Sequence, residues 1–125
     1  MLKKALIANS TFSLVSGLAL LVLASPLAAL IGLPTPAWVL GAVGIGVLLF
    51  GAAVGWAATR APVSRAHVVA VTVCDLSWVL GSAALLALCG HHFTAIGQLL
   101  IVAIAAAVAG FMLTQLIGLR RPVVA

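Results

Sequence analysis

The carboxyl group of Asp75 is the side chain best able to do chemistry in this sequence. It is the only acidic side chain among 125 residues, and no Lys or Arg occurs between residues 66 and 119 around it. About nine residues into a membrane-spanning helix, it would lie roughly 13–14 Å deep, where insertion of an aspartate costs about 2.5–3.5 kcal/mol. Without a counter-ion at that depth, desolvation favours the neutral acid. An ionisable residue inside a membrane is a candidate functional site by default.

The residues expected near this carboxyl group are small or polar. Counting from the helix ends places Ser13, Ser16, Gly51 and Gly110 at its level, Thr72 and Ser82 on its own helix face, and Trp78 one turn further along. One interpretation is structural: a protonated Asp75 hydrogen-bonds to the serines and to Trp78 and holds helices together. The other is a proton- or cation-binding centre, in which the face of Trp78 is open to a cationic or aromatic solute. That second interpretation predicts a small proton-coupled carrier or exporter.

Metal and cofactor chemistry have weaker candidates. Cys89, His91 and His92 cluster between two apolar blocks and could bind copper, zinc or a haem edge; the simpler interpretation is a solvated loop. We therefore expect no bound metal and no cofactor, with a haem- or metal-binding membrane protein as a further alternative. The sequence contains no Ser–His–Asp set, phosphate loop, paired carboxylates or HExxH motif, so we do not expect an enzyme.

The elements that must position these residues are membrane helices. The chain is 66 % hydrophobic and 6 % charged, with a mean hydropathy of +1.41, which excludes an ordinary soluble domain. The sequence predicts one integral-membrane domain over residues 1–125, an all-α, membrane-embedded four-helix bundle of up-down-up-down topology, with helices at about 5–24, 36–59, 64–89 and 94–118. Ser25 and Pro26 read as a cap and first residue of a short interfacial helix that Gly32 ends.

Two features bear on how the first two helices lie. Residues 1–24 have an alternative interpretation as a signal peptide, in which Lys3 and Lys4 form the basic region. In the second predicted span, Trp38 and Trp56 are separated by roughly 27 Å along a helix. That separation places one indole in each interfacial belt of a membrane.

The six positive charges predict the orientation. They occur in three pairs, before the first apolar block, between the two blocks and after the second: Lys3 and Lys4, Arg60 and Arg65, Arg120 and Arg121. The positive-inside rule then places both termini and the central loop in the cytoplasm. These cations would contact anionic lipid headgroups. They are too few and too scattered for nucleic-acid binding.

Small residues mark the faces through which membrane helices pack. In the second predicted helix Gly41, Gly44, Gly51 and Gly55 fall on one stripe, and Gly51 and Gly55 form a GxxxG motif. In the fourth, Gly110 belongs to a similar stripe. These faces could pack within one chain, or they could form the surface of a homo-oligomer or of a complex with another membrane protein.

Three parts of the sequence together are similar to a known group. They are Asn9, the segment Gly32-Leu33-Pro34, and the segment Asp75-Leu76-Ser77-Trp78-Val79. They resemble small, uncharacterised four-helix proteins of bacterial inner membranes. The resemblance implies the same fold and location and no particular activity. We therefore expect a non-catalytic inner-membrane protein that associates with itself or with a partner.

Overall fold

The computed structural model describes residues 2–32, 36–60 and 62–120, and these residues form helices and no strand. In chain order they are α1 (Leu2–Val22), α2 (Ala24–Ile31), α3 (Trp38–Ala58), α4 (Arg65–Cys89), the 3₁₀ turn η1 (Gly90–His92) and α5 (Ala95–Arg120). Within the described ranges, α1, α3, α4 and α5 are long and apolar enough to cross a membrane. The all-helical class is confirmed, and the four long helices fit a multi-pass membrane protein.

Some helix ends differ from the sequence expectation. α1 begins at Leu2 rather than near residue 5, and α5 continues to Arg120 rather than ending at 118. The short helix begins at Ala24, so Ser25 lies inside its first turn, and Leu23 occupies the N-cap without a side-chain cap. The chain passes from α1 into α2 through Leu23, whose N–H donates to Ala19 O at 2.8 Å and whose carbonyl accepts the N–H of Leu27 at 2.9 Å, so α2 begins before the expected cap. The sequence also predicts Thr35 as the cap of the second long helix, and this residue lies outside the described residues.

Gly32 ends α2, as its position in the sequence indicates. Its φ of 73° places it in the left-handed region, and its N–H points back to the carbonyls of Ala28 and Ala29. Glycine adopts this conformation without the steric cost that a Cβ would bring, and it commonly ends helices in this way. The chain therefore leaves α2 in a sharp turn rather than continuing as a longer helix.

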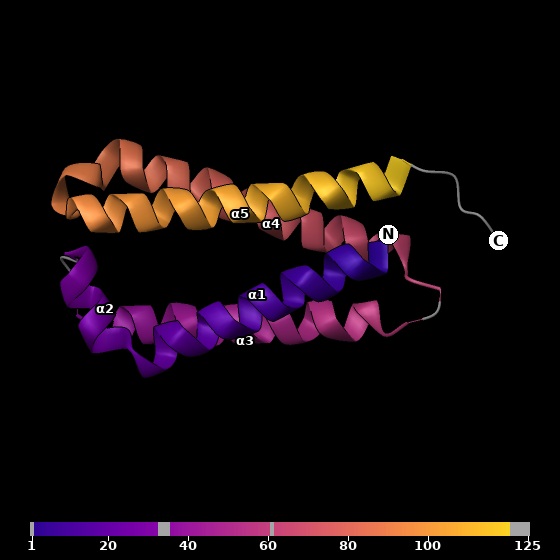
Figure 1. The fold of residues 1–125 in the computed structure, drawn as a ribbon, viewed down its shortest axis with the longest axis horizontal. Coiled ribbons are helices and arrows are strands. Elements are labelled where there is room, and N and C mark those ends of the chain that lie inside the picture. The colour runs from indigo at the N-terminus through magenta and orange to yellow at the C-terminus, as the bar shows by residue number, and fades with distance from the viewer. Residues whose placement is uncertain (1, 33–35, 61, 121–125) are drawn as a thin grey trace.

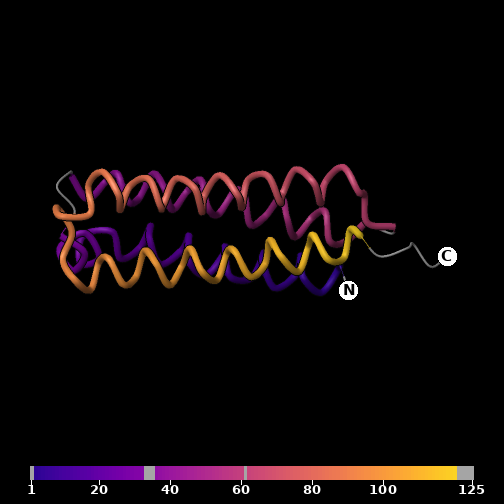
Figure 2. Tube along the Cα trace, turned by 90° about the horizontal axis from the view of Figure 1, so that it is seen from above, coloured from indigo at the N-terminus to yellow at the C-terminus, as the bar shows by residue number. Residues whose placement is uncertain are grey.

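The four long helices lie side by side as two pairs (Figure 1). α1 packs along α3, and α4 packs along α5. In the view turned by 90°, α3 and α4 lie in one layer, and α1 and α5 lie in the other (Figure 2). The start of α1, the end of α3, the start of α4 and the end of α5 lie at one end of the molecule, which we call the termini end, whereas α2 and η1 lie at the other, the α2 end (Figure 1).

The hydrophobic core lies toward the termini end. It joins buried residues of all four long helices: Leu6, Val54, Ala58, Val68, Val71 and Leu119. At this end Arg65 donates a hydrogen bond from Nη1 to the carbonyl of Leu119 at 2.8 Å, which links the start of α4 to the last turn of α5. By contrast, α3 and α4 make few contacts along most of their length.

A separate set of contacts closes the α2 end. The N–H and hydroxyl of Thr94 donate to the carbonyls of Ile31 and Leu30, at 3.0 and 2.8 Å. The same hydroxyl accepts the N–H of Gly97 at 3.0 Å, so Thr94 also caps α5. Gln98 donates to the carbonyl of Gly90 at 2.6 Å. These bonds fix α2 and η1 against the first turn of α5.

Candidate functional site

A buried polar cluster lies one to two turns inward from the hydrophobic core. Asp75 of α4 accepts two hydrogen bonds on Oδ2, from Asn9 Nδ2 of α1 at 2.8 Å and from Gln115 Nε2 of α5 at 2.9 Å. The Asn9 amide also approaches Gln115 Oε1 at 3.5 Å. The exposed fractions are 1 % for Asn9, 3 % for Asp75 and 0 % for Gln115. We call these three residues the Asn9–Asp75–Gln115 cluster.

The cluster joins α1 to α4, two helices that otherwise touch little. α1 and α4 are not closely packed neighbours, yet Asn9 and Asp75 meet between them. Both donors are neutral amides, and Asp75 is the single side-chain carboxylate of the chain. Polar side chains that hydrogen-bond across helices stabilise helix association in an apolar environment. The arrangement can therefore hold α1, α4 and α5 in one register.

The predicted site residues divide into three groups around this carboxyl group. Ser13 reaches the cluster indirectly, since its hydroxyl donates to Asn9 Oδ1 at 3.4 Å. Thr72 is buried, but its hydroxyl donates to Val68 O of its own helix at 2.8 Å. Ser16 and Ser82 are half-buried, and no hydrogen bond joins either to Asp75 among the described residues.

The position of Trp78 differs most from what the sequence analysis expected. The structural interpretation had its indole hydrogen-bonded to Asp75. Its side chain is 37 % exposed, and the two described hydrogen bonds on Asp75 come from Asn9 and Gln115. The indole instead lies at the surface of the helical bundle. Two amides thus take the place that the sequence analysis gave to serines and a tryptophan.

Sequence reasoning did not place Asn9 and Gln115 in the site. Counting from the helix ends put Ser13 and Ser16, and not these two amides, at the level of Asp75. The structure brings Asp75 to Asn9, one turn closer to the termini end than Ser13, because the helices are staggered. A usable signal was present: a carboxylate and two amides are strongly polar groups inside apolar helices, and such groups find one another when buried.

The glycine stripe of α3 faces α1. A Cβ at Gly44 would lie 2.8 Å from Gly17 O and 2.9 Å from Leu21 N, so the two backbones are in direct contact there. A Cβ at Gly51 would lie 3.1 Å from the Leu14 backbone nitrogen. Small residues permit this approach, which gains dispersion energy in place of a hydrophobic drive. The remaining stripe residues follow the same face: Gly41 is next to Leu21, and Gly55 is next to the Ser10 hydroxyl.

A hydrogen bond from α1 adds to this contact. The hydroxyl of Ser10 donates to the carbonyl of Gly51 at 2.7 Å, and Ser10 is buried. A larger residue at position 51 would push the two helices apart and lengthen this bond. Within the described structure the GxxxG motif of α3 is therefore in contact with its own chain.

Other glycines face open space. A Cβ at Gly46, Gly81 or Gly110 would meet nothing within 4 Å. Gly110, which the sequence analysis placed in a packing stripe of the last helix, thus has no helix against it among the described residues. These positions leave small-residue surfaces free on α3, α4 and α5.

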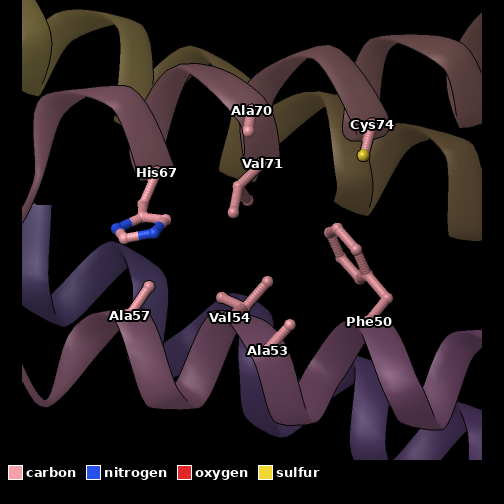
Figure 3. Close-up of a pocket in the computed structure, with 8 residues that line it drawn as sticks. All are labelled: Phe50, Ala53, Val54, Ala57, His67, Ala70, Val71 and Cys74. Atoms are coloured by element: carbon pink, nitrogen blue, oxygen red, sulfur yellow. The ribbon is translucent and has the colours of Figure 1, made fainter.

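An apolar crevice of about 170 Å³ lies between α3 and α4 (Figure 3). α3 contributes Phe50, Ala53, Val54 and Ala57, and α4 contributes His67, Ala70, Val71 and Cys74. Val54, Ala57 and Val71 are buried and form its floor, whereas Ala53, Ala70 and Cys74 are exposed and form its rim. The crevice exists because the side chains along this part of the α3–α4 seam are mostly short.

Three side chains in contact, those of Arg60, Trp56 and His67, lie at the end of this crevice nearest the termini end. The Arg60 guanidinium lies over the Trp56 ring at 4.2 Å from its centroid, and the His67 ring meets the same indole edge-on at 5.4 Å. Cation–π contact of this kind fixes an arginine side chain while leaving its N–H groups free to donate. His67 belongs both to this group and to the crevice lining.

The Cys89, His91 and His92 segment forms the α4–η1 junction. The two imidazole rings lie 4.0 Å apart, and Cys89 is half-buried. Within residues 2–32, 36–60 and 62–120, no three His, Cys, Asp or Glu side chains are grouped closely enough to hold a metal ion. The segment therefore offers at most two neighbouring imidazoles and a thiol.

No family model, curated protein or solved structure matches this chain.

Proposed function

We propose that this chain is a non-catalytic, multi-pass protein of the bacterial inner membrane that acts by associating with a second copy or with another membrane protein. The observation that carries the proposal is the Asn9–Asp75–Gln115 cluster. The carboxyl group, the most reactive candidate in the sequence, accepts hydrogen bonds from two amides of its own chain. A group held in this way serves to fix helix register, which is the best-attested use of buried polar residues.

The proposed topology is up-down-up-down, with both termini and the α3–α4 loop in the cytoplasm. It is supported by four long apolar helices and by the charge distribution, because all six Lys and Arg residues precede, separate or follow the two apolar blocks. The short helix α2 would then lie at the outer surface. The resemblance carried by Asn9 and the Asp75–Val79 segment supports the inner membrane as the location.

The proposed association surface is one face of α4. Ser77, Gly81 and Ala84 are exposed and recur at a spacing of four and three residues, so they share one side of the helix. A Cβ at Gly81 would meet nothing within 4 Å, so a second helix has room to approach the backbone. Helix interfaces in membranes are enriched in small residues, which let the two backbones approach closely. The corresponding glycines of α3 are already used against α1.

Cysteine cross-linking in native membranes tests this surface. Cys74 and Cys89 are first replaced by alanine, and single cysteines are then introduced as Ser77→Cys or Gly81→Cys. Gly110→Cys is the matched control, because that glycine also faces open space but lies on α5. Treatment with a bismaleimide should give a higher-mass adduct from positions 77 and 81 and none from 110. Equal adduct at 81 and 110, or none at 77 and 81, would rule out this face.

Reporter fusions test the topology separately. A fusion after Arg60 should behave as cytoplasmic, and a fusion near His91 should behave as periplasmic. A cytoplasmic reporter at His91 would contradict the proposed orientation, whatever the cross-linking shows.

A further inference from the structure

We propose that the crevice between α3 and α4 holds an acyl chain of an anionic phospholipid, with the lipid phosphate beside Arg60 and His67. The inference goes beyond association through α4, since it concerns the half of the α3–α4 seam nearest the termini rather than the Ser77–Ala84 face. It rests on the proposed orientation, with the termini end in the cytoplasm, and not on the proposed association through α4. Its three supports are the shape of the crevice, the charge at one end of it, and the absence of a competing side-chain anion in the sequence.

The shape fits a single hydrocarbon chain. From His67 to Cys74 the crevice follows seven residues of α4, about 10 Å along the helix axis. Its floor of Val54, Ala57 and Val71 and its exposed rim of small residues are apolar along this whole length (Figure 3). An α-helix about 10 Å across and 10 Å long occupies roughly 800 Å³. That is several times the 170 Å³ available, so a helix could at most insert side chains, whereas an extended acyl chain can lie in the crevice.

The charge fits a phosphate at the end nearest the termini. Arg60 and His67 both contact the Trp56 ring, and His67 also lines the crevice, so a guanidinium and an imidazole lie near the point where a lipid headgroup would meet the crevice. Guanidinium groups bind phosphate through paired hydrogen bonds, and anionic lipids of the cytoplasmic leaflet attract such cations. The predicted cytoplasmic location of this end places Arg60 at the headgroup level.

No side chain of the protein competes for this arginine. The sequence contains six Lys and Arg but one acidic side chain, and that side chain, Asp75, is held by Asn9 and Gln115. Arg65, the other cation near the loop, donates to the Leu119 carbonyl. The counter-anion of Arg60 must therefore come from outside the side chains, and in a membrane the nearest abundant anion is a lipid phosphate.

Native mass spectrometry of the purified protein, mixed with phosphatidylglycerol or phosphatidylcholine of identical acyl chains, tests the site. Arg60→Gln should lower retention of phosphatidylglycerol relative to phosphatidylcholine by about fivefold, the factor for one cation near an anionic headgroup. Ala70→Leu, which fills the crevice from its exposed rim, should lower retention of both lipids alike. The matched controls are Arg120→Gln, which removes a cation at the same end of the molecule, and Ala83→Leu, an exposed alanine of α4 outside the crevice.

The outcomes separate lipid binding from other occupants. Loss of phosphatidylglycerol in Arg60→Gln but not in Arg120→Gln, with loss of both lipids in Ala70→Leu but not in Ala83→Leu, supports the site. Equal losses of phosphatidylglycerol in Arg60→Gln and Arg120→Gln would show that retention depends only on the overall positive charge of this end, and would overturn the proposed site. A protein dimer that Ala70→Leu dissociates, with unchanged lipid retention, would assign the crevice to a second copy. Because the mass also reports oligomeric state, failure of the α4 association face is seen independently of lipid retention.

Discussion

Removing the acceptor of the Asn9–Asp75–Gln115 cluster should loosen the contact among α1, α4 and α5. In Asp75→Leu both amide donors lose their acceptor while they stay 0–1 % exposed. Interhelical hydrogen bonds in membranes average about 0.6 kcal/mol and reach about 1.7 kcal/mol. Two lost bonds therefore predict that the free energy of unfolding falls by about 1–3 kcal/mol. Asp75→Asn keeps one carbonyl oxygen that can accept from both donors, so its loss should stay below about 1 kcal/mol.

The measurement is unfolding in mixed micelles with increasing SDS, followed by circular dichroism. Position 75 remains in an apolar environment in both states, so the insertion cost of the aspartate largely cancels. Thr72→Val is the matched control, since Thr72 is buried on the same helix but bonds only to Val68 of that helix. We expect Thr72→Val to change stability by less than Asp75→Leu.

A double-mutant cycle makes the test specific for the cluster. Gln115→Leu and Asp75→Leu remove opposite ends of one hydrogen bond, so the double variant should lose less stability than the sum of the two single losses. Strict additivity would show that the two side chains do not interact. A stability of Asp75→Leu equal to or above that of the wild type would refute the reasoning that the cluster stabilises helix packing.

Three further outcomes follow from the contacts. Gly44→Leu should prevent α1 and α3 from packing and give aggregated or unfolded protein in detergent. Gly46→Leu should purify like the wild type, because a Cβ at that position meets nothing within 4 Å. Equal behaviour of the two variants would contradict the packing of α3 on α1. Ser10→Ala should lower the SDS midpoint slightly, by the equivalent of about 0.6 kcal/mol for its lost bond to Gly51, and an unchanged midpoint would show that this bond adds nothing. Addition of a panel of organic cations to purified protein should release no protons from the wild type or from Asp75→Asn; release from the wild type alone would establish a proton-coupled carrier in place of the association role.

Much of the local structure could be predicted from the sequence because it depends on neighbouring residues. Long runs without charge must form helices if they enter a membrane, since each backbone N–H and C=O then needs a partner within the segment. Gly32 could be predicted as the end of the short helix, since glycine readily adopts the left-handed turn found there. The start of the short helix was predicted wrongly: Ser25 lies inside α2, because the chain passes from α1 into α2 through Leu23, whose N–H donates to Ala19 O and whose carbonyl accepts the N–H of Leu27.

The partners of Asp75 could not be predicted from the sequence. Residue counting assumes that all helices start at one level, and an error of one turn, 5.4 Å, replaces one set of neighbours by another. The structure staggers the helices so that Asn9 and Gln115, rather than Ser16, meet the carboxyl group. Trp78, on the same helix as Asp75, lies at the surface of the bundle instead. The same holds for the glycines: a stripe shows that a helix has a packing face but not which helix covers it.

The sequence by itself determined the apolar helices, the positions of the charges, and the presence of one acidic side chain without a basic neighbour in its segment. These properties depend on composition and on the residue periodicity within a single helix. Only the tertiary structure decided that α3 packs its glycines on α1, that two amides hold Asp75, and that α3 and α4 leave an apolar crevice between them. The physical reason is that helix pairing depends on the rotation and axial shift of each helix. Both are set by the sum of many weak contacts between distant segments rather than by any local preference.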